Sequence, residues 1–334
     1  MEYVQIASLP KASRVGLGTW AIGGWMWGGT DEAKAIDAIH QALDMGITLI
    51  DTALVYGFGE SEKICGKALK NYGKRDKIVL ATKTGLSWDS KNQIYRNAGK
   101  NQIFKEIEIS LKNLQVDYID LYQVHWPDPE TPIAETAEAM AALLESGKIR
   151  AIGVSNFSVE MIKEFTKTAP VHAVQPPYNM FERDAEKEIL PFCHKENIKV
   201  LGYGTLCRGL LTGKMKSDTK FEGDDIRKID PKFQEPHFSR YIKTVWELDQ
   251  WSREKYKKPV IDLAVRFALD KGVDIALWGA RRPEQLKPIE DLWDWRLANQ
   301  DIEEIEDILQ KYILEPIGPE FMAPPGKTQW KKAS

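Results

Sequence analysis

Cysteine and histidine are scarce in this chain, which has three cysteines and five histidines among its 334 residues. The cysteines, Cys65, Cys193 and Cys207, are odd in number and widely separated. Their arrangement fits neither a disulfide framework nor the spacing of a zinc site, and it indicates a reducing compartment. The histidines form no cluster with other metal-binding residues, so we expect no metal site and no metal-dependent hydrolase.

The chain also lacks long apolar runs and a strong excess of charge. No apolar signal segment occurs near the N-terminus, and no run is long enough to span a bilayer. The formal net charge is −3 and the pI is about 6.1, which leaves no electrostatic footprint for nucleic acid or an anionic membrane. We therefore expect a cytoplasmic monomer with neither nucleic-acid nor membrane partners.

Short apolar segments alternate with amphipathic segments along most of the chain. Residues 31–45 carry apolar side chains at helical spacing, including Ala35, Ile39 and Ala42. Further helices are predicted at Ser61–Leu69, Asn101–Leu114, Ile133–Ser146, Val159–Thr168 and Asp184–Asn197. Eight apolar segments are typical of buried parallel strands: Arg14–Thr19, Ile47–Asp51, Ile78–Lys83, Ile119–His125, Ile149–Ser155, His172–Gln175, Ile198–Tyr203 and Asp274–Trp278.

Eight strands with helical crossovers predict a (β/α)8 barrel that forms a single domain over residues 1–334. The competing fold is a doubly wound open sheet, which needs a glycine-rich phosphate turn after its first strand. The segment GLGTWAIGG supplies glycines, but Trp20 and Trp25 interrupt that fingerprint. The barrel is therefore the better interpretation.

Two segments exceed what a minimal barrel needs. Cys207–Ser239 is a long, charged loop after the seventh strand, a length typical of lids and binding segments, with a solvated insertion as the alternative. Near the C-terminus, Asp301–Lys311 predicts a helix. Glu315–Gln329 predicts an extended tail, because four prolines there disfavour a helix: Pro316, Pro319, Pro324 and Pro325.

Four side chains of complementary chemistry lie near the ends of successive predicted strands. Asp51, Lys83 and His125 end the second, third and fourth strands, and Tyr56 follows in the loop after Asp51. Active sites of (β/α)8 barrels lie at this rim. An ammonium lowers the pKa of a phenol, ordinarily about 10, by favouring the phenolate. We predict carbonyl reduction with Tyr56 as the general acid.

In this scheme Lys83 lowers the pKa of Tyr56, Asp51 pairs with Lys83, and His125 orients the carbonyl. Each residue also has an ordinary structural interpretation. Asp51 could cap a helix, Lys83 could be an exposed strand end, His125 could sit in the core, and Tyr56 could serve packing alone. The combination on one rim is more specific than any single member.

A second set of residues suits a nicotinamide. Ser155 and Asn156 end the fifth strand and Gln175 the sixth, where they can hydrogen-bond a carboxamide, and Tyr203 ends the seventh, where its ring can stack. For Ser155 and Asn156 the alternative is a cap for the helix at Val159.

Two further segments suit phosphates. In GTLCRGLLTGK, backbone donors together with Arg208 and Lys214 suit a pyrophosphate. After the eighth strand, Gly279 permits a close backbone approach, and Arg281 and Arg282 precede a short helix near Pro283. This arrangement suits the 2′-phosphate of NADP(H), with a solvated arginine pair as the alternative.

Several segments together carry a resemblance: GLGTW, ITLIDTALVYG, LATKTG, IDLYQVHWPD, GKIRAIGVSNF, VQPPYN, LGYGTLCRGLLTGK and ALWGARRPEQL. In these the chain resembles the aldo-keto reductase superfamily over nearly its whole length. The tail GPEFMAPP makes it most similar to the bacterial general-stress branch. The resemblance implies a (β/α)8 barrel without a Rossmann domain, NADPH bound across the strand ends, and 4-pro-R hydride transfer to a carbonyl.

The resemblance also implies site residues. The catalytic set is placed at Asp51, Tyr56, Lys83 and His125. The implied cofactor-binding set comprises Thr19, Trp20, Asp51, Ser155, Asn156, Gln175, Tyr203, Gly204, Thr205, Leu206, Cys207, Arg208, Gly209, Lys214, Gly279, Ala280, Arg281 and Gln285.

The sequence departs from the superfamily pattern at two places. Gly204 and Thr205 follow Tyr203 where many relatives have Ser-Pro. Pro288 and Ile289 occupy the positions of a Glu-Asn pair that contacts adenine in many relatives. With this adenine contact changed, we expect the choice of NADPH over NADH to depend mainly on Arg281 and Arg282.

The substrate is less clearly indicated. Five tryptophans could ring the cavity mouth and favour aromatic or apolar carbonyl compounds, or could serve packing: Trp20, Trp25, Trp27, Trp88 and Trp126. Lys91, Arg96 and Lys100 suggest instead an anionic or polyhydroxy substrate. We predict an NADPH-dependent reductase of small-molecule aldehydes and ketones. The alternative is a cofactor-sensing regulatory subunit on the same fold, with little turnover.

Overall fold

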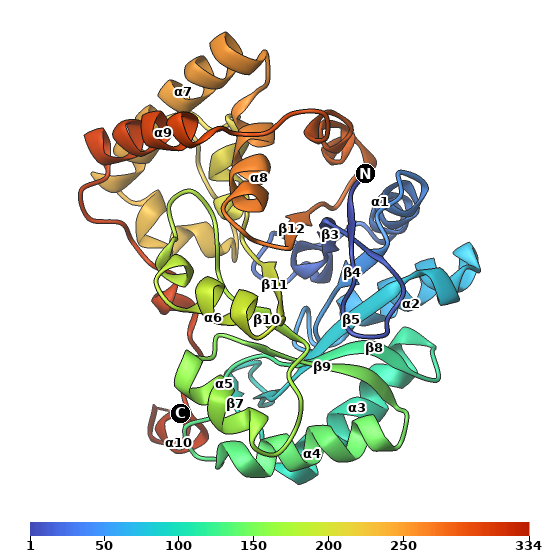
Figure 1. Cartoon of the computed structure of the whole chain (residues 1–334). Helices are drawn as coiled ribbons and strands as arrows, with labels where there is room; N and C mark the ends of the chain where they lie inside the picture. The colour runs from blue at the N-terminus through green and yellow to red at the C-terminus, as the bar shows by residue number, and fades with distance from the viewer. Residues whose placement is uncertain (334) are drawn as a thin grey trace.

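Eight parallel strands close into a barrel in the computed structural model, which describes residues 1–333 (Figure 1). Each strand pairs with the next, and the pairing of β12 with β3 closes the ring. The prediction of a (β/α)8 barrel is confirmed, and the closure excludes an open sheet. The strands are β3 (Val15–Gly18), β4 (Leu49–Asp51), β5 (Val79–Thr84), β8 (Ile119–Val124), β9 (Ile149–Ser155), β10 (Ala173–Gln175), β11 (Lys199–Gly202) and β12 (Ile275–Gly279).

Helices cover the outside of the barrel, and their buried faces follow the predicted spacing. In α1 the side chain of Asp31 caps the first turn by accepting from the backbone N–H of Lys34, and Ile39 lies on the buried face. The helices are α1 (Glu32–Asp44), α2 (Glu60–Tyr72), α3 (Lys100–Leu114), α4 (Ile133–Glu145), α5 (Val159–Thr166), α6 (Ile189–Lys195), α7 (His237–Tyr256), α8 (Val260–Asp270), α9 (Asn299–Tyr312) and α10 (Lys327–Ala333).

The predicted helix Asp184–Asn197 is divided in the structure. A 3-10 turn at Asp184–Glu186 is followed by a new start of helix at Ile189. Pro191 accounts for the division. It lies in the first turn of α6, where proline is tolerated, whereas a helix begun at Asp184 would hold it in its interior.

Alternate strand residues fill the barrel, and a short hairpin closes the end at which the strands begin. The interior cluster includes Leu49, Ala81, Leu121 and Leu201. The loop of the hairpin β1 (Tyr3–Val4) and β2 (Ala12–Ser13) adds Ile6 and Leu9 to this cluster. Because side chains alternate along a strand, the inward positions that remain lie at the carboxyl ends. These positions carry polar residues: Asp51, Lys83, Gln123, Ser155 and Gln175.

The segment Cys207–Ser239 is more ordered than the predicted loop. It contains 3-10 turns at Cys207–Thr212, Ile226–Lys228 and Pro231–Phe233, and α7 already begins at His237. Ile226 and Phe233 are buried, so a solvated insertion is excluded. The segment also contacts the loop after β3, because the backbone N–H of Ile226 donates to the carbonyl of Met26 over 3.0 Å.

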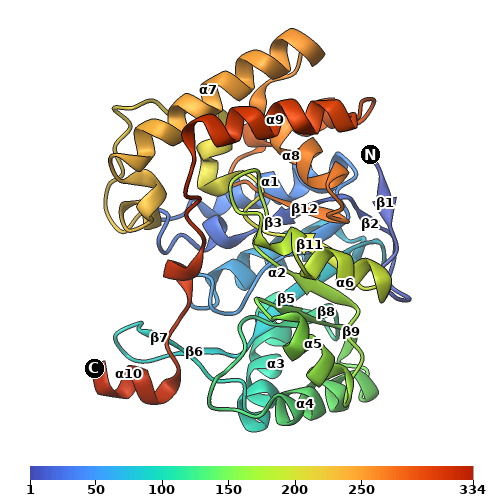
Figure 2. The same ribbon diagram turned by 60° about the vertical axis from the view of Figure 1, so that its left-hand side comes forward.

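The C-terminal tail crosses from α9 to the opposite side of the barrel mouth (Figure 2). It ends in α10 beside the hairpin of β6 (Leu86–Trp88) and β7 (Ile94–Arg96). The helix predicted at Asp301–Lys311 is present as α9. The prediction of an extended tail is wrong at two places: a 3-10 turn forms at Glu320–Met322, and α10 begins at Lys327, after the last proline, Pro325.

The tail is held by the β6–β7 hairpin. Arg96 Nε donates to the carbonyl of Pro324 over 2.6 Å, and the backbone N–H of Arg96 donates to the carbonyl of Pro325 over 2.9 Å. Tyr95 stacks on Trp330 at 4.5 Å between ring centroids.

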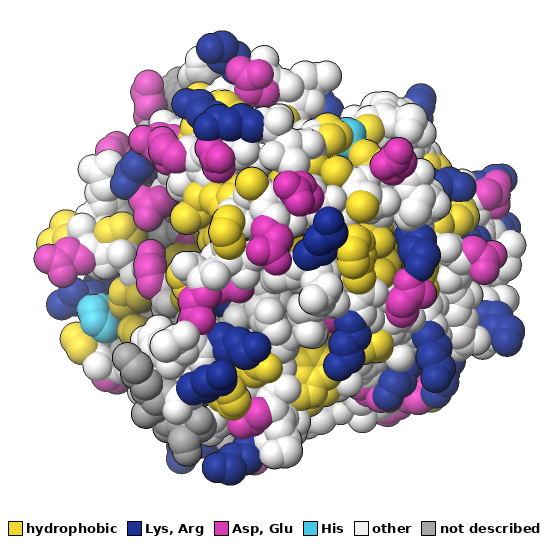
Figure 3. Space-filling model, turned by 90° about the horizontal axis from the view of Figure 1, so that it is seen from below, with side chains coloured by type: hydrophobic (Ala, Val, Ile, Leu, Met, Phe, Trp, Pro, Cys, Tyr) yellow, Lys and Arg dark blue, Asp and Glu magenta, His cyan; other side chains and the backbone are white. Residues whose placement is uncertain are grey.

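The face in Figure 3 carries interspersed basic, acidic and apolar side chains. Over residues 1–333, no helix has the length and apolar character needed to cross a membrane.

Candidate active site

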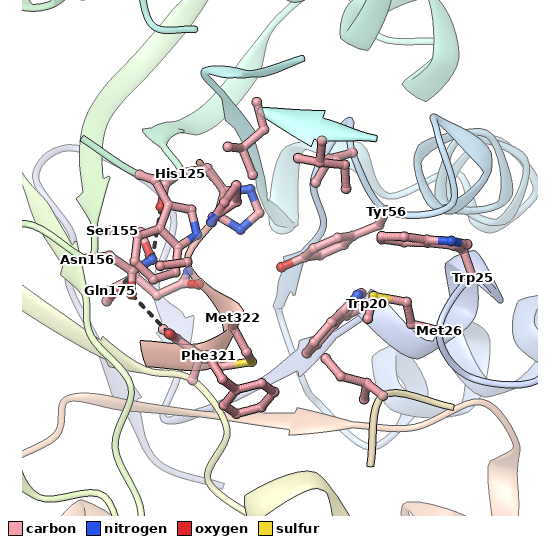
Figure 4. A pocket seen from close by; sticks show the side chains of 18 of the residues that line it. Trp20, Trp25, Met26, Tyr56, His125, Ser155, Asn156, Gln175, Phe321 and Met322 are labelled. Carbon is pink, nitrogen blue, oxygen red and sulfur yellow. Dashed lines mark hydrogen bonds between the residues drawn. The ribbon is translucent and has the colours of Figure 1, made fainter. Parts of the chain in front are cut away.

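A cavity of about 290 Å³ opens at the carboxyl ends of the strands. Figure 4 shows Tyr56 directed into it, with His125, Ser155 and Asn156 on the opposite side. Most of the remaining wall is apolar: Trp20, Trp25, Met26, Val55, Leu86, Ile94, Trp126, Ile226, Ile229, Phe321, Met322, Ala323 and Pro324. One end of the cavity is therefore polar and the other is hydrophobic.

The predicted catalytic residues lie together at the polar end. Lys83 Nζ is 2.5 Å from Asp51 Oδ2 and 3.4 Å from Tyr56 Oη. It also donates to the carbonyl of Thr52 over 2.9 Å. Asp51 and Lys83 are almost fully buried, so the interpretation of Lys83 as an exposed strand end is wrong. The amine thus bridges the carboxylate and the phenol.

Tyr56 is positioned by close backbone packing and by two rings. Its neighbour Gly57 has φ +60°, and a Cβ there would lie 2.1 Å from the carbonyl oxygen of Gly23. On either side of the phenol, Trp20 lies 6.1 Å away nearly parallel and His125 lies 5.6 Å away edge-on, between ring centroids. Packing alone does not explain a hydroxyl aimed into a cavity.

Burial shifts the pKa of Tyr56, Lys83 and His125 away from their ordinary values. Burial, and then the charge of Asp51, raise the pKa of Tyr56 well above its ordinary value. The lowered pKa that we expected for Tyr56 is not found, because desolvation dominates. Burial, and then the charge of Lys83, hold the pKa of His125 well below 6.5. Near neutral pH, Tyr56 is a protonated phenol and His125 a neutral imidazole.

The predicted nicotinamide partners form a connected group beside these residues. Ser155 Oγ donates to the backbone carbonyl of Gln175 over 2.8 Å, and Asn156 Nδ2 donates to Ser155 Oγ over 3.1 Å. Tyr203 Oη donates to Asn156 Oδ1 over 2.9 Å. The helix α5 is capped by Ser158, so the interpretation of Ser155 and Asn156 as its cap is wrong.

A second cavity of about 250 Å³ runs from this group toward β12 and shares Trp20, Tyr56, Gln175 and Tyr203 with the first. Further residues of the predicted cofactor set line it: Thr19, Asp51, Gly204, Thr205, Leu206, Arg208, Gly209, Gly279, Ala280, Arg281 and Gln285. Trp27, which we expected at the cavity mouth, and Thr212 of GTLCRGLLTGK also line it, as does Arg227, which the sequence did not indicate. Arg227 lies in the long loop, and no local motif marks it.

Two of the proposed phosphate ligands are placed differently from the prediction. Arg208 Nε donates to Asp230 over 2.5 Å and Arg208 Nη2 to Glu182 over 2.7 Å. This guanidinium is thus committed to buried carboxylates, which leaves the backbone of Arg208 for a pyrophosphate. Lys214 is exposed and Cys207 is fully buried, and neither lines the second cavity.

The two arginines after β12 also have different environments. Arg281 Nη1 donates to the carbonyls of Trp27 and Gly29 over 2.7 and 3.1 Å, so it ties the loop after β3 to the second cavity. Arg282 is exposed and does not line that cavity. Gln285 Oε1 accepts from the backbone N–H groups of Arg281 and Arg282 and thereby fixes this turn.

The residues considered for the substrate also separate. Trp20, Trp25 and Trp126 line the first cavity and Trp27 the second, whereas Trp88 packs on Phe58 and lines neither. Of the basic residues, Lys91 and Lys100 are exposed and line neither cavity. Arg96 donates to the carbonyls of Pro324 and Pro127. These three basic residues therefore give no support to an anionic or polyhydroxy substrate.

The contribution of the tail to the cavity wall was not expected from the sequence. Phe321, Met322, Ala323 and Pro324 line the first cavity although they lie far from it along the chain. No group of three His, Cys, Asp or Glu side chains suited to a metal ion occurs among residues 1–333.

Comparison with known proteins matches residues 14–310 to the model of the aldo/keto reductase family. Aldo-keto reductase YhdN of Bacillus subtilis is 57% identical over 98% of this chain and 100% of that protein. The NADH-specific methylglyoxal reductase of Escherichia coli is 38% identical over 82% of this chain and 88% of its own. Among solved structures, the glycerol dehydrogenase AKR11B4 from Gluconobacter oxydans matches with a TM-score of 0.87 and 50% identity, over 96% of this chain and 99% of that chain.

Proposed function

The chain belongs to the aldo/keto reductase family, and we propose that it reduces aldehydes and ketones to alcohols with NADPH, using Tyr56 as the general acid. Membership in this family makes the protein an oxidoreductase that acts on carbonyl compounds with a nicotinamide cofactor. The observation that carries the finer proposal is the place of Tyr56. Its hydroxyl lies 3.4 Å from Lys83 Nζ, and the residue lines both cavities.

The two connected cavities suit an extended dinucleotide and a carbonyl compound. Ser155, Asn156 and Gln175 would hold the carboxamide, Tyr203 would stack on the nicotinamide ring, and the backbone from Gly204 to Gly209 would face the pyrophosphate. When bound, NADPH supplies the hydride that reduces the carbonyl carbon. The hydrogen-bonding side chains and the ring of Tyr203 where the two cavities meet fit such a group.

The chain's own residues would supply the proton and stabilise the charge that its transfer leaves. Tyr56, protonated at neutral pH, donates its proton to the carbonyl oxygen as negative charge develops there. Lys83 then faces the phenolate left on Tyr56 and stabilises it, while Asp51 keeps the amine in place. His125, neutral, can donate a hydrogen bond to the same oxygen and orient it. In the reverse direction the phenolate accepts the alcohol proton.

The preference for NADPH rests on Arg281, which borders the second cavity, with Arg282 next to it. Because one relative is named an NADH-specific enzyme, this choice needs its own measurement. The apolar wall of the first cavity favours aldehydes and ketones with apolar or aromatic substituents. The relatives are named as enzymes, which supports turnover over a regulatory role.

The proposal is tested by following NADPH oxidation with 4-nitrobenzaldehyde. Tyr56→Phe should lower kcat by about 10²- to 10⁴-fold, because it removes the proton donor. NADPH binding, measured by fluorescence, should persist. The matched control is Tyr72→Phe, since that hydroxyl contacts Asp44 on the outside of the barrel. NADPH binding without turnover on a broad panel of carbonyl compounds would favour the regulatory alternative.

A further inference from the structure

Gln123 is a buried amide at the end of the barrel that no step of the proposed reaction uses. It lies on β8 and is fully buried. Its side chain shares the inward face of that strand with Leu121 of the interior cluster. Gln123 Nε2 donates to Asp51 Oδ1 over 3.0 Å. A polar side chain this deeply enclosed among Leu and Ala residues is costly unless its hydrogen bonds are made.

The amide closes a ring of three hydrogen bonds. Gln175 Nε2 donates to the same Asp51 Oδ1 over 2.9 Å and to Gln123 Oε1 over 3.2 Å. Both hydrogens of Gln175 Nε2 are therefore used by Asp51 and Gln123. The carbonyl oxygen of the Gln175 amide is left for the cavities, both of which Gln175 lines. The orientation of that amide is thus set from within the barrel.

The same ring supports the acid–base pair. Asp51 uses one carboxylate oxygen for Lys83 and the other for the two amides. A buried carboxylate is stabilised in its charged form by such donors. The backbone makes room for the arrangement, because a Cβ at Gly153 of β9 would lie 2.8 Å from Gln123 Cγ. The missing side chain at Gly153 thus leaves the space that the Gln123 side chain occupies.

We propose that Gln123 is a positioning residue that joins two parts of the site through Asp51. On one side it fixes the carboxylate that holds Lys83 against Tyr56. On the other side it orients the Gln175 amide toward the carboxamide of the nicotinamide. This inference rests on the proposed function, since it assigns Gln123 a task in aligning the proton donor with the hydride donor.

The test compares Gln123→Met, which keeps the length of the side chain and removes its hydrogen bonds, with Tyr122→Phe. Tyr122 lies next along β8 and packs in the cluster outside the barrel, so its variant should behave like the parent. In Gln123→Met, kcat for 4-nitrobenzaldehyde should fall about 10- to 100-fold while KM changes less than about threefold.

A second variant displaces the amide without removing it. Gly153→Ala forces Gln123 to move and should reproduce the fall in kcat with little change in KM. In a Gln123→Ala background, where the contacting Cγ is gone, the added Gly153→Ala change should cost much less. Thermal unfolding of each variant separates a loss of fold from a loss of alignment.

A binding measurement keeps the inference testable apart from turnover. Gln123→Met should weaken NADPH relative to 2′-phospho-ADP-ribose, which lacks the nicotinamide, by about three- to tenfold compared with the parent. If the parent binds both but never reduces a carbonyl, the proposed function fails and this ratio still decides the role of Gln123. If Gln123→Met keeps the parent's binding ratio and kcat, the inference is wrong.

Discussion

Lys83 Nζ lies 2.5 Å from Asp51 Oδ2, and neither side chain is more than a few per cent exposed. Two buried opposite charges stabilise each other only as a pair, because each alone would carry an uncompensated desolvation cost. The Asp51–Lys83 pair of the candidate site is therefore also a structural pair, which leads to a prediction about stability.

Lys83→Met should lower the free energy of unfolding by about 3–5 kcal/mol, since it leaves the Asp51 carboxylate buried without its partner. The double variant Asp51→Asn, Lys83→Met should be less destabilised than the sum of the two single variants. Urea denaturation at neutral pH measures both quantities. Lys67→Met, which removes an exposed partner of Glu32, serves as the control and should change little. Additive losses in the double variant would contradict this coupling.

Arg281→Ala should reduce the preference for NADPH over NADH, measured as the ratio of kcat/KM values, by about tenfold or more. The guanidinium borders the second cavity and also ties the loop after β3 through the carbonyls of Trp27 and Gly29. KM for NADH should rise less than KM for NADPH, because only the latter carries the extra phosphate. Arg282→Ala is the comparison, since that side chain is exposed and should have the smaller effect. An unchanged ratio in both variants would remove these arginines from cofactor choice.

The dependence of stability on pH should reveal the neutral His125. Its pKa lies well below 6.5 in the fold through burial, whereas in the unfolded chain it takes up a proton near 6.5. The unfolded state then binds more protons below pH 6.5, so this histidine's stabilising contribution is complete above that pH and is lost as pH falls. The slope is at most about 1.4 kcal/mol per pH unit for one histidine.

His125→Gln should therefore lose less stability than the parent between about pH 7.5 and 5.5, as measured by urea denaturation. His172, whose pKa burial also lowers, should give a second, separate reduction when replaced by Gln. Burial and the neighbouring Asp291 raise the pKa of Asp262 to about 7, which acts in the opposite direction within this range. The comparison between variant and parent cancels that contribution. Identical slopes in His125→Gln and the parent would contradict a neutral buried imidazole.

Much of the site followed from the sequence because strand periodicity is local. In ITLID and IVLATK a short, mostly apolar segment ends in a charged residue, and the barrel brings Asp51 and Lys83 to one rim. The predicted strand bounds differ from the observed ones by no more than two residues. A barrel with polar carboxyl ends could thus be predicted without any long-range contact.

What could not be predicted depends on contacts between distant residues. Arg208 looked like a phosphate ligand, yet its partners Glu182 and Asp230 lie 26 and 22 residues away and claim its guanidinium. Although burial alone would raise it, the charges of Arg208 and Lys232 hold the pKa of Glu182 below its usual value. Gln123 likewise gave no signal, because its importance comes from Asp51, 72 residues away.

The cavity wall formed by the tail leads to a prediction about substrate size. Phe321 lines the first cavity, as Figure 4 shows, and its ring lies 5.5 Å from the Arg208 guanidinium and 5.9 Å from Lys232 Nζ. Lys232 Nζ also donates to the carbonyl of Gly318 over 3.2 Å. The buried charges therefore hold the tail, and we expect the tail to set how far the apolar end of the cavity extends.

Phe321→Ala should lengthen that end and raise the ratio of kcat/KM for 2-naphthaldehyde over benzaldehyde by about tenfold, because removed ring volume admits a second fused ring. The buried charges remain paired in this variant, so its thermal stability should fall only modestly. Trp246→Ala removes an exposed aromatic ring of α7 that does not line the cavity, and it should leave the ratio unchanged. An unchanged ratio in a folded Phe321→Ala protein would mean that the tail does not limit the substrate, and that the rings of Trp25 and Trp126 set the boundary instead.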